Sequence, residues 1–151
     1  MEYIETDFDV REFLLDQRIK GMTLEGVELM DSYIRSCWEK GVSVRCDPSL
    51  DAYGTYNTAE NTLTLGEYAL DSNYQLIETM EHEFMHVLQD EMAGIWNADT
   101  QVLGLPVNDY GEAMVNNSDH YSSLSEHEQA LEVEAFSIEE HLENPELMTL
   151  L

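Results

Sequence analysis

Five consecutive residues, His82-Glu83-Phe84-Met85-His86, have the types and spacing of a metal-dependent hydrolytic site. In a helix, His82 and His86 lie one turn apart on the same face, so both imidazoles can reach one Zn²⁺. Glu83 projects off that face, where its carboxylate can hold a water at the metal and act as general base. The alternative is an acidic surface helix that carries two histidines by chance.

A third zinc ligand must come from elsewhere in the chain, because a catalytic zinc usually has three protein ligands. Met92 stands where the metzincin pattern places a third histidine, so that pattern is excluded. Glu132 is the preferred ligand, since on a helix it lies beside Leu131 and Ala135, at the boundary between the buried and exposed faces. Glu134 is expected to face away. The alternatives are Glu128 and three histidines, His120, His127 and His141.

The N-terminal part is predicted to contain two helices within residues 9–40. Asp9 resembles an N-cap of the first helix, which should end near Gly21. Thr23 can cap the second helix, and Gly41 can follow its C-terminal end.

Short strands are predicted next, at Val42–Val44, Tyr53–Tyr56 and Thr62–Leu65. The last two flank a hairpin loop, and Thr62–Leu65 alternates polar and apolar residues as a half-buried strand does. Residues 95–123 look irregular.

Two capping boxes predict the helices that would hold the zinc ligands. Ser72 begins a long helix that ends near Gly94, and Ser125 begins a last helix, which Pro145 stops at about residue 144. Helices together with a small antiparallel or mixed sheet make an α+β fold. The length of 151 residues, without a repeat or linker, indicates a single domain over the whole chain.

Charge is distributed unevenly along the chain. There are 32 Asp and Glu against six Lys and Arg, giving a net charge of -26, and no basic residue follows Arg45. Binding to nucleic acid or to an anionic membrane is therefore disfavoured. The chain shows neither a membrane-spanning run nor a signal peptide, and its two cysteines, Cys37 and Cys46, form no disulfide framework. A cytoplasmic location is the expectation.

Two segments resemble the zincin metallopeptidases, specifically the gluzincin branch. One is Thr79–Gln89, which contains the H-E-x-x-H motif, and the other is Glu132–Phe136, which is similar to the E-x-E-A segment of small gluzincins. The resemblance implies a minimal zincin-like domain in which Glu132 is the third zinc ligand. It also implies a hairpin whose edge strand aligns an extended peptide substrate, and Asn61–Leu65 occupies the matching place.

The chain departs from this pattern at Phe136, where many relatives have Asp or Asn. If that polar residue orients a ligand histidine in the relatives, another group must do so here, and Glu78 is one candidate.

The expected reaction is hydrolysis of a peptide or protein substrate with one Zn²⁺ per chain. Glu83 would take a proton from the metal-activated water and pass it to the leaving amine. Tyr110, His120 or Tyr121 would stabilise the oxyanion, because no Arg follows Arg45. Two other classes remain open: an inactive zincin-fold protein that binds a metal or a partner, and an acidic mimic of nucleic acid.

Overall fold

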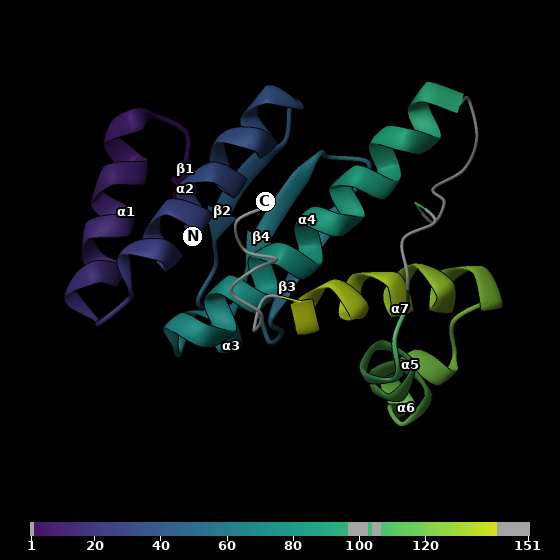
Figure 1. The fold of residues 1–151 in the computed structure, drawn as a ribbon. Helices are drawn as coiled ribbons and strands as arrows, with labels where there is room; N and C mark the ends of the chain where they lie inside the picture. Colours follow the sequence, from purple (N-terminus) through teal and green to yellow (C-terminus); the bar gives the residue numbers. More distant parts are fainter. Residues whose placement is uncertain (1, 97–102, 104–106, 142–151) are drawn as a thin grey trace. The chain divides into compact units, whose positions relative to one another are not determined.

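The computed structural model describes residues 2–96, 103 and 107–141 (Figure 1). The chain forms two compact units, residues 1–87 and 88–151, and the boundary between them falls inside helix α4 (Asn73–Trp96). Each unit is described by itself. The prediction of one domain over residues 1–151 stays a prediction.

The elements of the described residues mix helices with one four-stranded sheet, which confirms the α+β fold class. In chain order they are β1 (Glu2–Ile4), α1 (Asp7–Ile19), α2 (Leu24–Glu39), β2 (Ser43–Cys46), β3 (Gly54–Asn57), β4 (Thr62–Leu65), α3 (Glu67–Leu70), α4, α5 (Asp109–Asn116), α6 (Asp119–Ser122) and α7 (Glu126–His141). None of the described helices is long and apolar enough to cross a membrane. The zincin-like arrangement stays a prediction.

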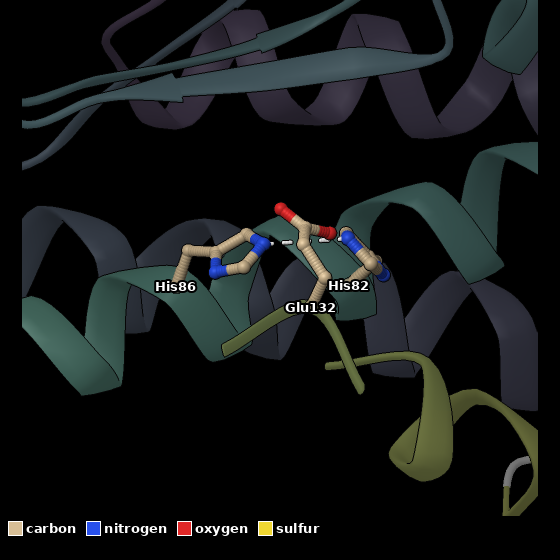
Figure 2. A group of neighbouring side chains, drawn as sticks. All are labelled: His82, His86 and Glu132. Atoms are coloured by element: carbon tan, nitrogen blue, oxygen red, sulfur yellow. Dashed lines mark hydrogen bonds between the residues drawn. The ribbon is translucent and has the colours of Figure 1, made fainter. Parts of the chain in front are cut away.

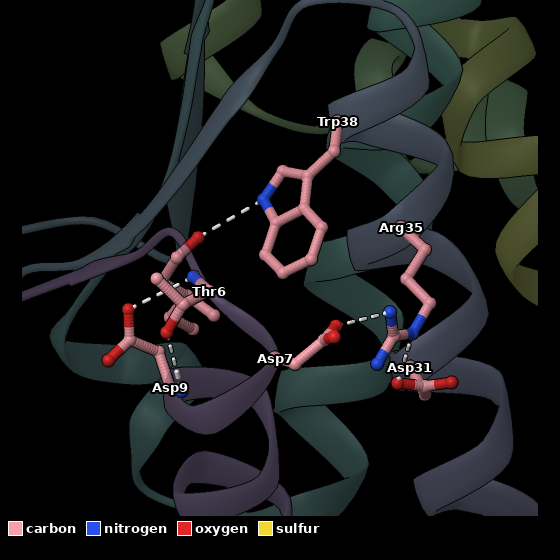
Figure 3. A network of polar contacts seen from close by, with 7 residues as sticks. Thr6, Asp7, Asp9, Asp31, Arg35 and Trp38 are labelled. Atoms are coloured by element: carbon pink, nitrogen blue, oxygen red, sulfur yellow. Dashed lines mark hydrogen bonds and ion pairs between the residues drawn. The ribbon is translucent and has the colours of Figure 1, made fainter.

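Helix α1 begins earlier than predicted, because its N-cap is Thr6 rather than Asp9. The Thr6 hydroxyl accepts a hydrogen bond from the Asp9 backbone N–H at 3.1 Å, and the Asp9 carboxylate accepts one from the Thr6 backbone N–H at 3.1 Å (Figure 3). Asp9 is thus the reciprocal member of the capping box. Thr23 caps α2 as predicted, and Gly41 follows α2 with a φ of 76°, a left-handed conformation that favours glycine.

The sheet has the strand order β1-β2-β4-β3, in which only the β2/β4 pair is parallel. The predicted hairpin is confirmed by the antiparallel β3/β4 pair, which sets Gly54 opposite Leu65. Strand β1 was not predicted, because three residues in an acidic segment are too short to show an alternating pattern.

The prediction that Thr62–Leu65 is a half-buried strand at the sheet edge is wrong. All four residues of β4 are buried. Successive side chains point to opposite faces of a sheet, so both faces are covered at β4. Since β4 also pairs with β2 and β3, the hairpin strand at the edge of the sheet formed by the described residues is β3.

In the first unit, α2 packs against α4 through close contacts in the core. A side chain at Gly26 would lie 3.0 Å from the Ile77 side chain, and the Tyr33 and Phe84 ring centroids are 4.9 Å apart. Helix α2 therefore supports the segment of α4 that contains the two histidines.

In the second unit, α5 packs closely on α7. The Asn108 backbone N–H donates to Ser137 Oγ at 3.1 Å, and Asn108 Nδ2 donates to the Ser137 carbonyl at 3.0 Å. A side chain at Gly111 would overlap Ser137 Oγ and the Val133 carbonyl. The prediction of irregular structure is thus wrong for α5 and α6. Helix α5 has eight residues and contains Gly111, a weak helix former. Its stability therefore depends on tertiary contacts.

Helix α7 begins as the capping box predicts. Ser125 Oγ accepts from the Glu128 backbone N–H at 3.1 Å. The predicted stop at about residue 144 lies outside the described residues.

Candidate metal centre

Helix α4 places His82 and His86 one turn apart, as their spacing predicts. Their Nε2 atoms are 3.3 Å apart, and the two rings meet edge to face with centroids 5.0 Å apart. Two nitrogen ligands bound tetrahedrally to one Zn²⁺ at about 2.05 Å are separated by roughly 3.3–3.4 Å. The two nitrogens therefore have the separation of a zinc-binding pair.

Glu132 joins this pair in the structure (Figure 2). One ligand atom from each of His82, His86 and Glu132 lies within 4.8 Å of the other two. His82 is buried, whereas His86 and Glu132 are half-buried, as expected for a carboxylate between the buried and exposed faces of α7. Among the described residues, this is the one group of His, Cys, Asp and Glu with ligand atoms close enough to share an ion.

The alternative third ligands differ from Glu132 in position. Glu128 is exposed in the first turn of α7, where it accepts a hydrogen bond from Ser125 Oγ at 3.0 Å. His127 is also exposed. The side chains of His120 and His141 lie outside the described residues. Among the alternatives whose side chains the structure describes, Glu132 is therefore the one that lies with the histidine pair.

Glu83 is buried at 9% exposure, and the strand β3 passes close to it. A Cβ atom at Gly54 of β3 would lie 2.7 Å from Thr79 Cγ2, 2.8 Å from the Thr64 carbonyl oxygen and 3.4 Å from Glu83 Cγ. The absent side chain thus lets this edge strand approach α4 beside the predicted general base. The sequence analysis did not single out Gly54, although a glycine inside a strand pattern signals a close approach of this kind.

A buried carboxylate next to His82 contacts α2. Glu81 is 1% exposed and lies against Tyr33 of α2. Burial raises the pKa of Tyr33, and the neighbouring Glu81 charge raises it further. The burial of Glu81 was not predicted, because an acidic residue in an acid-rich helix looks solvated.

Glu134 is buried, which its place in an acid-rich helix did not predict. It is 2% exposed, and its Oε1 accepts from Gln89 Nε2 at 2.9 Å and from the Leu103 backbone N–H at 2.7 Å. Gln89, which is fully buried, also donates to the Leu131 carbonyl at 3.2 Å. A buried amide on α4 therefore ties that helix to α7.

The residues predicted to assist the reaction lie on three helices. The ring of Tyr121 packs against the ring of Phe136, with centroids 5.6 Å apart, which is a contact within the second unit. Tyr110 is half-buried on α5, and Glu78 is half-buried on α4. Their roles in catalysis stay predictions.

Comparisons of this chain with protein-family models, with curated protein sequences and with solved structures find no match. The resemblance to the gluzincins therefore depends on the two short segments that suggested it. Function must be argued from the geometry of the side chains themselves.

Proposed function

We propose that this chain is a zinc-dependent metallopeptidase with a minimal zincin-like fold, in which His82, His86 and Glu132 hold one Zn²⁺. The observation that carries the proposal is the 3.3 Å separation of the two Nε2 atoms in a group that Glu132 completes. Two imidazoles and one carboxylate form the ligand set of several zinc peptidases, with a fourth position left open. The donor set and its burial therefore fit the ion.

Glu83 is the proposed general base. When bound, Zn²⁺ would polarise the scissile carbonyl and acidify a water at the open position. The Glu83 carboxylate would accept a proton from that water and later deliver it to the nitrogen of the leaving amine. Its burial beside Gly54 restricts its rotamers, so the proton acceptor would be held in one place.

The proposed substrate is a peptide or protein in an extended conformation. Strand β3 is at the edge of the sheet and approaches α4 at Glu83. A peptide added to that edge would form backbone hydrogen bonds with β3. This replaces Asn61–Leu65, whose strand is central, as the segment that would align the substrate.

The first test combines metal analysis with one substitution. The purified chain should contain about one zinc, and Glu83→Gln should keep the zinc but lose hydrolysis of a peptide library by about 10²–10⁴-fold. Glu128→Gln is the matched control, because it makes the same chemical change at an exposed position of α7, and it should keep both properties. A folded chain that binds no zinc would refute the metal site, and unchanged turnover in Glu83→Gln would remove Glu83 from the mechanism.

A second candidate is a zincin-fold protein that binds metal without turnover. The observation in its favour is that no Lys or Arg follows Arg45, so no fixed cation from that part of the chain can stabilise an oxyanion. One bound zinc together with equal inactivity of the wild type and Glu83→Gln would select this candidate.

A further inference from the structure

We propose that Gln89 and Glu134 form a positioning pair that sets Glu132 against the two histidines. This inference rests on the proposed metal site and adds two residues that do not themselves touch the metal. Gln89 follows His86 by three residues, so the two side chains lie on adjoining parts of one face of α4. The same stretch of helix thus carries a proposed ligand and the contact that orients α7.

The contacts of Gln89 bracket Glu132 along α7. Its Nε2 donates to the Leu131 carbonyl at 3.2 Å and to Glu134 Oε1 at 2.9 Å. An amide nitrogen has two hydrogens, so these bonds use its whole donor capacity. One acceptor precedes Glu132 and the other follows it, and because both bonds meet at one nitrogen they anchor the stretch of α7 that contains Glu132 at that point.

A second donor holds the Glu134 side chain itself in place. The Leu103 backbone N–H donates to the same Oε1 at 2.7 Å. Glu134 is 2% exposed and Gln89 is fully buried. Breaking either bond would leave a buried polar group unsatisfied, which costs more than the bond itself contributes. The pair is therefore a stiff contact.

The neutral character of Gln89 also suits the site. A Lys or Arg at this position could pair with Glu134, but its charge would then lie one turn from His86 and repel a bound cation. An amide supplies the same hydrogen bonds without a net charge. The negative charge of Glu132 is thus left for the metal.

The test measures metal affinity in Gln89→Met, which has similar volume but no donor. The Kd for Zn²⁺, measured by chelator competition, should rise roughly 10–100-fold, as when an outer-sphere partner is lost. The absorption spectrum of the Co²⁺-substituted protein should change with it, because a displaced Glu132 changes the coordination. Glu134→Gln retains Oε1 as acceptor and should keep nearly the wild-type Kd.

A matched control separates positioning from general stability. Ser137→Ala removes buried hydrogen bonds of α7 to Asn108 and to the Val133 carbonyl. It should lower the thermal midpoint without changing the Kd for Zn²⁺ or the Co²⁺ spectrum. If Gln89→Met behaves like Ser137→Ala, the positioning role is refuted while the metal site stands. If the wild type binds neither ion, the proposed function itself is refuted.

Discussion

Two polar networks show how differently the N-terminal and C-terminal parts of the chain satisfy their carboxylates. Near the N-terminus, Arg35 pairs with Asp7 at 2.7 Å and with Asp31 at 3.0 Å (Figure 3). These side chains are 38–67% exposed. In the C-terminal part, Glu134 is 2% exposed and accepts neutral N–H groups from Gln89 and Leu103.

The difference follows from where the basic residues stand in the sequence. All six precede residue 46, and ion pairs join Lys20 to Asp16 and Arg35 to both Asp7 and Asp31. Exposed pairs of this kind contribute little to stability. In the C-terminal part, the buried Glu134 carboxylate accepts instead from an amide and a backbone N–H.

The largest expected effect is on metal affinity when a ligand of the C-terminal part is removed. Glu132→Ala should weaken Zn²⁺ binding by about 100-fold or more, at or beyond the upper end of the cost of losing an outer-sphere partner. The measurement is chelator competition. Glu128→Ala on the same helix is the control and should retain wild-type affinity. The opposite ranking would transfer the ligand role to Glu128.

Removing the metal should have the next largest effect, on the stability of the whole fold. An ion that binds only the folded chain stabilises it by about 2.7 kcal/mol when its free concentration is 100 times the Kd. Thermal unfolding with and without a chelator, at moderate salt, measures this contribution. Equal midpoints would mean that the acidic part of the chain needs no cation and that its charge serves solubility.

A third substitution tests the buried network alone. Glu134→Leu removes the acceptor for Gln89 and Leu103 and should lower the free energy of unfolding by about 1–3 kcal/mol. Glu134→Gln keeps that acceptor and should lower the free energy of unfolding by a smaller amount. Urea unfolding of both variants in metal-free buffer makes the comparison. Equal losses would show that the charge of Glu134, and not its hydrogen bonds, stabilises this region.

The smallest effect on the thermal midpoint is expected at the exposed network of Arg35, Asp7 and Asp31. Arg35→Met should change the thermal midpoint least of all these variants, and added salt should shrink the difference further. Trp38→Phe is a useful control, because it removes the 3.1 Å hydrogen bond from Trp38 Nε1 to the Ile4 carbonyl. Salt does not screen that hydrogen bond. A large loss in Arg35→Met would contradict the contrast between the two networks.

Much of the fold was predictable from local signals. Thr23, Ser72 and Ser125 cap the helices they were expected to begin, because a cap is made within one turn of chain. The β3/β4 hairpin was predictable for the same reason, because its two strands are neighbours in the chain. Strand β1 and helix α5 were missed, since β1 depends on pairing with β2 and α5 on its packing against α7.

The candidate site, like the fold, has some features that follow from the local sequence and others that depend on tertiary packing. The sequence by itself determined that His82 and His86 lie one turn apart on one face, because the period of one helix sets their spacing. It also determined the confinement of basic residues to the first 45 positions. Only the tertiary structure decided that Glu132 reaches the pair, that Glu134 is buried on Gln89 and that β3 is the edge strand beside Glu83. Those relations join segments far apart in the chain, and their geometry depends on packing that no local pattern encodes.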